Sequence, residues 1–226
     1  MSRKEFELFL YKNKYNQKNL IDIIPELSCK TISNILFDLE KKSDASVSGD
    51  KNNQNKLYVY TDGGCKSNGK KNARAAYSIF FTDDIESNLY PLNKTRLLIT
   101  EPTNQKAELT AIKQLFSTIV KNAELFQDKE IIVCTDSMYS INCIEKWSKT
   151  WQKNDWKTAK NEPVKNMEII QDILRLKNLI HDKITFQHVF SHTVEPSDKK
   201  SLKYKIWLGN NIVDSNINKL LESNVE

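Results

Sequence analysis

The chain has 226 residues and a formal net charge of +5, with 39% hydrophobic and 28% charged residues. This length suits one sizeable domain, or a small domain followed by a larger one. No apolar run approaches the ~20 residues needed to cross a bilayer, and the start "MSRKEFELFLYKNK" lacks the features of a signal peptide. We therefore expect an intracellular protein of the cytoplasm or nucleus, neither secreted nor bound to a membrane.

Residues 1–42 are predicted to form a small helical module. Its last segment places Ile32, Ile35 and Leu39 on one face, with Ser28 as the N-cap. Such a module could resemble a helix-turn-helix domain that binds nucleic acid, or a small bundle that contacts a protein partner. The sequence leaves both open. Residues 43–56, "SDASVSGDKNNQNK", have the composition of a flexible linker.

Residues 57–226 alternate between strand and helix patterns and are predicted to form one α/β domain. The first three strands favour an antiparallel meander, and the apolar run "EIIVCTD" is typical of a parallel strand covered on both faces. The expected strands are 57–62, 74–81, 89–100, 130–136 and 183–190, and the expected helices are about 103–121, 137–147, 165–180 and a last helix after Gly209.

The stretch "LYVYTDGGCKSNG" begins with strand-forming residues and then reaches an aspartate and two glycines. The pattern predicts a strand that ends abruptly at Asp62. Taken alone, Asp-Gly most often marks a hairpin turn. A chemical role for Asp62 therefore depends on other acids along the chain.

Three further acids occupy unusual positions. Glu108 shares its helix face with Ile112 and Leu115, where a carboxylate is costly unless it is paired or binds a metal. Asp136 terminates a buried strand, at the edge where open α/β sheets place ligands. Asp214 lies in the first turn or so of the last predicted helix, where a favourable interaction with the helix dipole is the simpler explanation.

Together, these four carboxylates indicate a cation site. Clustered acids repel one another, and oxygen ligands without cysteine or histidine select hard divalent ions such as Mg²⁺ or Mn²⁺. Two ions about 4 Å apart among carboxylates suit in-line phosphoryl transfer on nucleic acid.

Several motifs, in order, resemble ribonuclease H, type 1, over residues 57 to about 221. They are "YTDGGCKSNG", "TNQKAELTAI", "TDSMYSINCIEKW", "WKTAKNEPVKN" and "GNNIVD". The resemblance implies a mixed five-stranded sheet flanked by helices. It also implies a monomer that hydrolyses the RNA strand of RNA–DNA hybrids and leaves 3′-hydroxyl and 5′-phosphate ends.

By the same resemblance, Asp62, Glu108, Asp136 and Asp214 would hold two Mg²⁺ ions, with Mn²⁺ as a substitute. Asp62 would lie between the ions, and His192 would be the mobile histidine that assists product release. The glycines after Asp62 would let the backbone approach the substrate.

The resemblance also implies substrate contacts. The RNA strand would contact Gly63, Gly64, Cys65, Ser67, Asn68, Asn104 and Gln105. The DNA strand would contact Thr103, Tyr139, Asn142, Trp151, Trp156, Lys157, Thr158 and Asn166. Trp147 is expected in the core. Turn formation by Asn68, and helix capping by Thr103 and Asn104, are the structural alternatives.

The chain departs from the family pattern near the predicted histidine. Ser191 replaces a glycine, Asn211 stands where an acid often occurs, and residues 193–208 form a longer, lysine-bearing connection that we expect to re-tune turnover. Two other functions remain open: a junction resolvase or integrase of the same fold, and a non-catalytic scaffold that binds hybrids.

Overall fold

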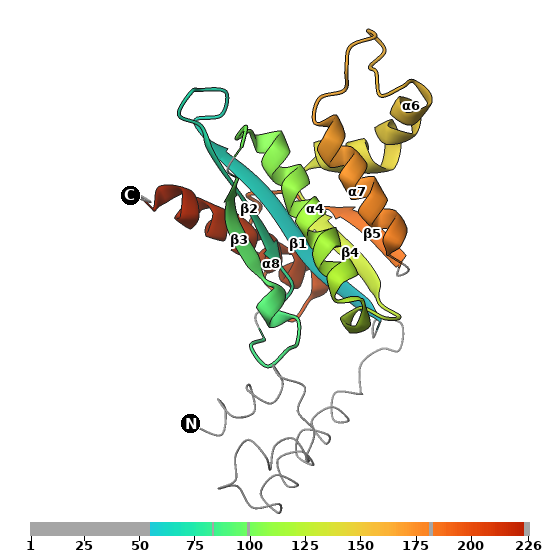
Figure 1. Cartoon of the computed structure of the whole chain (residues 1–226). Coiled ribbons are helices and arrows are strands. Elements are labelled where there is room, and N and C mark those ends of the chain that lie inside the picture. The colour runs from blue at the N-terminus through green and yellow to red at the C-terminus, as the bar shows by residue number, and fades with distance from the viewer. Residues whose placement is uncertain (1–54, 83, 99, 181–182, 224–226) are drawn as a thin grey trace, which may run out of the picture. The chain divides into compact units, whose positions relative to one another are not determined.

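The structure, a computed structural model, describes residues 55–82, 84–98, 100–180 and 183–223 (Figure 1). Within these residues the chain forms a mixed five-stranded sheet in the order β3-β2-β1-β4-β5, with helices on both faces. The predicted α/β class and five-stranded sheet are confirmed. The predicted helical module at 1–42 and nearly all of the 43–56 linker lie outside the described residues.

The five strands pair as the meander and the apolar run predicted. β1 is antiparallel to β2, and β2 is antiparallel to β3. β4 is parallel to β1, and β5 is parallel to β4. The bounds are Lys56–Lys66 for β1, Arg74–Phe80 for β2, Lys94–Leu98 for β3, Glu130–Thr135 for β4 and Lys183–His188 for β5.

The helices cover the sheet unequally. α4 contacts β1, β2 and α7, whereas α8 contacts β1, β2 and β3 (Figure 1). The α-helices are α4 (Asn104–Lys121), α5 (Met138–Asn142), α6 (Ser148–Lys153), α7 (Met167–Leu179) and α8 (Leu202–Glu222). Shorter segments are η1 (Tyr90–Leu92), η2 (Ala123–Leu125) and the π-helical η3 (Cys143–Trp147).

Two apolar layers follow from the alternation of side chains along each strand. Val59 of β1 and Val133 of β4 belong to the larger core, which includes residues of α4 and α7. Tyr60 and Cys134, one residue further along, belong to a second cluster with Val213 of α8. The sheet is therefore buried on both faces, as the continuous apolar run predicted for β4.

The prediction that "DGG" ends a strand is wrong, because β1 continues through both glycines to Lys66. A Cβ at Gly63 would lie 2.1 Å from the backbone nitrogen of Glu108 in α4, and a Cβ at Gly64 would lie 2.7 Å from Ile217 Cγ2 in α8. The consecutive glycines thus let two helices approach opposite faces of one strand, which is a known use of glycine inside a strand.

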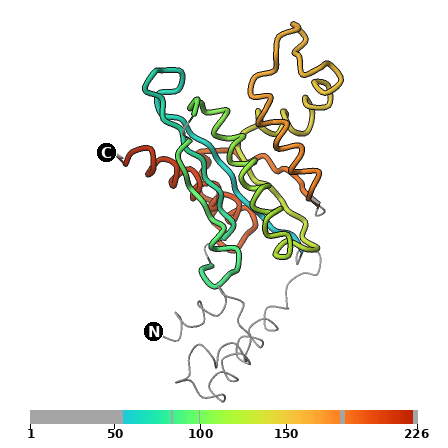
Figure 2. Tube along the Cα trace, viewed as in Figure 1, coloured from blue at the N-terminus to red at the C-terminus, as the bar shows by residue number. Residues whose placement is uncertain are grey.

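Two predicted boundaries are also wrong. The expected strand at 89–100 begins only at Lys94, because Pro91 lies in the helical turn η1. The last helix begins at Leu202, before Gly209, with the Ser201 side chain accepting a hydrogen bond from the Tyr204 N–H at 3.1 Å. Part of the predicted long connection is therefore the beginning of α8, and the trace from β5 into α8 can be followed in Figure 2.

Candidate active site

Asp62 and Asp136 lie side by side because of the strand register. Tyr60 of β1 pairs with Cys134 of β4 in parallel, and each aspartate comes two residues after its member of this pair. The period of two places both aspartates on the same face as Tyr60 and Cys134, which is the face covered by α8. The Gly63 N–H donates to Asp62 Oδ1 at 2.7 Å and orients that carboxylate.

Glu108 reaches the same edge from the opposite face. Because Gly63 has no side chain, the α4 backbone at Glu108 packs directly against β1. The Asn104 side-chain amide donates to Glu108 Oε1 at 2.7 Å, one helical turn before it. Glu108 is thus held by its own helix, and its carboxylate is half-buried.

Asp214 approaches from α8, about three turns after the helix begins at Leu202. The prediction that placed it in the first turn is therefore wrong, and the helix dipole does not explain this acid. The Asn218 side-chain amide donates to Asp214 Oδ1 at 3.1 Å. One turn before Asp214, the Asn210 Oδ1 atom is buried and has no hydrogen-bond partner.

The four carboxylates are close enough to affect one another's ionisation. Burial, the Asp136 charge and then the Asp214 charge raise the pKa of Asp62 to about 7, against the lowering effect of the Gly63 N–H. Burial, followed by the charges of Asp136 and Asp62, raises the pKa of Glu108 to about 8. Burial chiefly raises the pKa of Asp136, and the Asp214 charge adds to this. All four predicted acids thus belong to one electrostatic cluster.

The donor set of this cluster fits a hard divalent cation. Four carboxylates with unrelieved repulsion are oxygen ligands of the kind that Mg²⁺ prefers. Within the described part of the chain, however, no three histidine, cysteine or acidic side chains are arranged so that they could already hold an ion. The fit therefore lies in the chemistry of the donors.

Ser191 and His188 also contact this cluster, and the sequence did not identify either as a site residue. The His188 Nε2 atom lies 3.1 Å from the backbone oxygen of Asp136. A hydrogen bond from the Ser191 side chain, together with the His188 charge, works against the rise in the pKa of Asp136. The sequence did contain a sign that Ser191 is unusual, because this serine replaces the glycine that usually precedes the histidine in the similar family.

His192, the predicted mobile histidine, follows Ser191 in the chain. Its side chain is exposed and its φ of 54° lies in the left-handed region. Among the described residues no hydrogen bond, ion pair or ring contact involves this side chain. The predicted role of His192 in product release stays a prediction.

Several residues predicted to contact RNA gather at the N-terminus of α4. The Asn104 N–H donates to Asn68 Oδ1 at 3.3 Å, and the Cys65 thiol donates to the Pro102 carbonyl at 3.4 Å. Ser67 turns the chain with a φ of 56°. Gln105 is exposed on the first turn of α4. The glycines 63 and 64 are explained by helix packing, and their contact with RNA stays a prediction.

The residues predicted to contact DNA divide into an aromatic row and a turn. Tyr139, Trp147, Trp151 and Trp156 follow one another with ring centroids 6.1, 5.7 and 6.4 Å apart. The prediction of Trp147 in the core is wrong, because 40% of this residue is exposed. The Asn166 amide donates to the Tyr139 hydroxyl at 3.1 Å.

The remaining predicted DNA contacts lie at the ends of α4 and α5 and in the turn between α6 and α7. The Thr103 hydroxyl caps α4 by accepting from the Lys106 N–H at 3.2 Å, as the capping alternative predicted. Thr158 Oγ1 accepts from two backbone N–H groups in the turn between α6 and α7. Asn142 ends α5 half-buried, and Lys157 is exposed beside this turn.

The described residues contain no helix that is both long enough and apolar enough to span a bilayer.

Comparison with known proteins places these features in context. The family model described as RNase H matches residues 54–215. Ribonuclease H1 of Mus musculus is 34% identical over 139 residues, which cover 61% of this chain and 44% of the mouse protein. Ribonuclease H of Ehrlichia chaffeensis is 31% identical over 153 residues, which cover 67% of this chain and 92% of that relative. The chain therefore matches less than half of the mouse relative's length.

Solved structures share the fold. The native crystal structure of prototype foamy virus protease–reverse transcriptase superposes with a TM-score of 0.56 at 22% identity, covering 78% of this chain and 22% of that chain. The foamy viral protease–reverse transcriptase in complex with dsDNA gives a TM-score of 0.50 at 19% identity. This match covers 72% of this chain and 92% of that chain. At these identities the likeness concerns the fold alone.

Proposed function

The chain belongs to the RNase H family, as its motifs predicted, and on this premise we propose that it hydrolyses the RNA strand of RNA–DNA hybrids. The observation that carries the proposal is the meeting of Asp62, Glu108, Asp136 and Asp214 at one edge of the sheet. These acids come from β1, α4, the end of β4 and α8. No packing requirement explains four mutually repelling carboxylates there, whereas phosphodiester hydrolysis does.

The proposed cofactors are two Mg²⁺ ions, with Mn²⁺ as a substitute, held by the four carboxylates. Held there, the ions would supply Lewis-acid activation of a water and stabilisation of the leaving 3′ oxygen, which would give 3′-hydroxyl and 5′-phosphate ends. Burial and the neighbouring carboxylates raise the pKa of Asp62 and Glu108, so their ionised forms are disfavoured, and a bound cation would favour those forms.

The protein's own polar groups would position the RNA. The Asn104 side-chain amide donates a hydrogen bond to Glu108, and the Asn104 backbone N–H donates one to the Asn68 side chain. The three residues therefore form one connected set. A 2′-hydroxyl both donates and accepts hydrogen bonds, and amide side chains do the same. We propose that this set distinguishes RNA from DNA beside the scissile bond.

The aromatic row would follow the DNA strand. The rings of Tyr139, Trp151 and Trp156 are half-buried, and exposed lysines, among them Lys157, occur in the same segment of the chain. Aromatic planes with neighbouring cations suit a nucleic-acid backbone. The N-terminal module is proposed to bind nucleic acid or a protein partner, and the enzyme to act as a monomer inside the cell.

The test is a cleavage assay on the purified full chain. End-labelled RNA–DNA hybrid, duplex DNA and duplex RNA are each incubated with Mg²⁺ or EDTA. We expect cutting of the hybrid's RNA strand alone, only with Mg²⁺, and a 5′-phosphate at the new end that allows ligation. Asp136→Asn is expected to abolish cutting.

The matched control is Asp172→Asn, which removes an aspartate of α7 that pairs with Lys113 at 2.6 Å. This variant is expected to cut as the wild type does. Cleavage of DNA junctions instead of hybrids would show a resolvase-like enzyme and contradict the proposal. Tight hybrid binding without cutting would show the scaffold function.

A further inference from the structure

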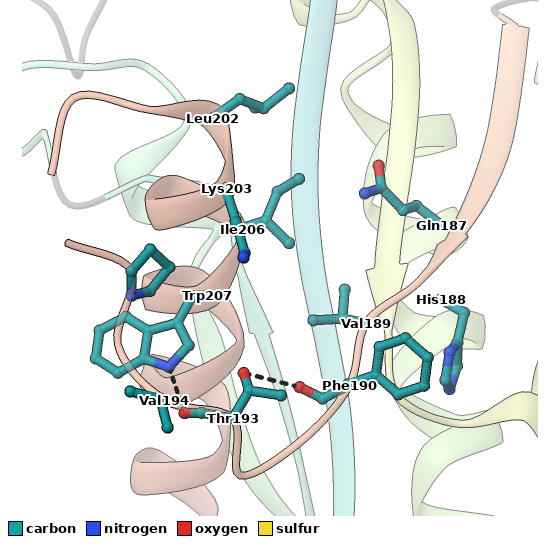
Figure 3. Close-up of a pocket in the computed structure, with 11 residues that line it drawn as sticks. Gln187, His188, Val189, Phe190, Thr193, Val194, Leu202, Lys203, Ile206 and Trp207 are labelled. Carbon is teal, nitrogen blue, oxygen red and sulfur yellow. Dashed lines mark hydrogen bonds between the residues drawn. The ribbon is translucent and has the colours of Figure 1, made fainter. Parts of the chain in front are cut away.

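A pocket of about 670 Å³ lies between the end of β5 and the first turns of α8. Its volume falls within the roughly 300–1,000 Å³ usual for small-molecule sites. The pocket involves none of the four carboxylates, and part of its wall comes from residues 193–207, where the sequence departs from the family pattern. Figure 3 shows the Trp207 ring on the α8 side and the Phe190 ring on the β5 side, with Val189 and Ile206 between them.

The two rings are held in place. The Trp207 indole N–H donates to the Thr193 carbonyl at 2.9 Å, and the Tyr204 ring packs against Trp207 at a centroid distance of 5.7 Å. The Phe190 and His188 rings pack in a T-shaped pair with centroids 5.0 Å apart, and Phe190 is 73% exposed. Two oriented aromatic planes therefore stand open to a flat, apolar ligand.

The charge of the pocket points to an anionic ligand. Lys203 extends from α8 into the space beside these rings (Figure 3) and forms no ion pair with any residue that the structure describes. Lys200 and Lys205 on the same segment are also exposed. Aromatic planes with an unpaired lysine are the combination that binds single-stranded nucleotides, through stacking of the base and neutralisation of the phosphate.

We propose that this pocket binds the base of an unpaired nucleotide that extends the RNA strand of a hybrid. His188 joins the pocket to the site, since it lines the pocket and contacts the Asp136 backbone oxygen at 3.1 Å. Asp136 belongs to the cluster proposed to cut RNA, so the RNA strand is the one that passes nearest to the pocket. The inference rests on the proposed function and extends it to hybrids with single-stranded RNA tails.

The experiment uses the full chain in EDTA, so that binding is measured without cleavage. Four hybrids are compared: one has no extension, two have an RNA extension with one 2-aminopurine, and one has a DNA extension with one 2-aminopurine. RNA extensions are made at the 5′ end and at the 3′ end. We expect fluorescence quenching by stacking with one of the RNA extensions, and binding about tenfold tighter than with an abasic extension of the same length.

Two variants and two matched controls locate the effect. Phe190→Leu and Lys203→Gln are each expected to remove most of the quenching, and both positions are exposed enough to leave folding intact. The controls Tyr90→Leu and Lys121→Gln change an exposed aromatic residue and an exposed lysine that are distant in sequence from the pocket residues. They are expected to quench as the wild type does.

The outcomes separate the inference from the proposed function. A protein that cuts blunt hybrid with Mg²⁺ but shows no quenching overturns the pocket assignment alone. Quenching that survives in both Phe190→Leu and Lys203→Gln also overturns it, and stronger quenching on the DNA extension overturns the choice of strand. A protein that quenches but never cuts hybrid overturns the proposed function and leaves the binding site standing.

Discussion

Replacing Asp62 by asparagine should stabilise the metal-free protein while abolishing activity. The amide has the shape of the carboxylate, and its oxygen can still accept the Gly63 N–H that Asp62 Oδ1 accepts at 2.7 Å. What the substitution removes is a charge that is partly buried and repelled by Asp136 and Asp214. Stability is thus sacrificed for function at this position.

The size of the effect follows from the pKa. Asp62 titrates at about 7 instead of 3.8. At about 1.4 kcal/mol per pKa unit, ionising it in the folded protein costs at most about 4 kcal/mol. Because the folded pKa is the higher one, folded protein retains a proton that the unfolded chain has released, and stability falls as pH rises from about 4 to about 7. Allowing for relaxation of the neighbouring charges, we expect the free energy of unfolding of Asp62→Asn to rise by about 2 kcal/mol relative to the wild type across this pH range.

The assay is urea unfolding of both proteins in EDTA, from about pH 4 to pH 8. The difference in the free energy of unfolding should grow with pH. Mg²⁺ at pH 8 should then stabilise the wild type more than the variant, because the cation relieves a repulsion that the variant lacks.

Asp172→Asn is the control of opposite sign. In the wild type, the hydrogen bond from Lys113 lowers the pKa of Asp172. The ionised carboxylate therefore stabilises the fold above its ordinary pKa, and this stabilisation is lost as the pH falls. This variant should be less stable than the wild type at pH 8. If Asp62→Asn and wild type instead keep a constant difference at every pH, neither burial nor the neighbouring carboxylates raise the pKa of Asp62 in the folded protein, and the reasoning is refuted.

Four other substitutions test the packing and the substrate surface. Gly63→Ala would place a Cβ 2.1 Å from the Glu108 nitrogen, so its free energy of unfolding in urea should fall by about 3 kcal/mol or more. In the control Gly69→Ala the new Cβ meets no atom within 4 Å, and the free energy of unfolding should fall by only about 1 kcal/mol because of the backbone conformation. Equal losses would contradict the close approach of α4. Phe116→Ala empties a fully buried site and should cost about 3–5 kcal/mol in the same assay. Trp151→Leu should raise KM for the hybrid several-fold with kcat retained. An unchanged KM would show that Trp151 does not contribute to binding the DNA strand.

Much of the site could be predicted because its acids break local rules. Asp136 ends a buried strand and Glu108 lies on an apolar helix stripe, and such conflicts between local pattern and burial are visible without coordinates. The pairing directions also followed from the patterns, since the first three strands form the predicted antiparallel meander and the apolar run lies beside parallel neighbours.

Glycines were misjudged for one physical reason. Gly63 suggested a strand end, and Gly209 suggested a helix boundary, because glycine commonly interrupts regular structure. Each instead lies inside an element and makes room for a partner distant in sequence: the α4 backbone at Gly63, and the Tyr60 ring, 2.4 Å from a Cβ at Gly209. A local pattern does not contain this information, because only the packed structure says what occupies the missing side chain's place.

The sequence by itself thus determined the strand pattern, the acids and the family. The tertiary structure decided that Asp214 lies deep within α8 and that Ser191 reaches Asp136, and it revealed a pocket between Phe190 and Trp207. The reason is that local propensity acts over a few residues, whereas repulsion among carboxylates and the shape of a pocket depend on distances between elements that only the fold brings together.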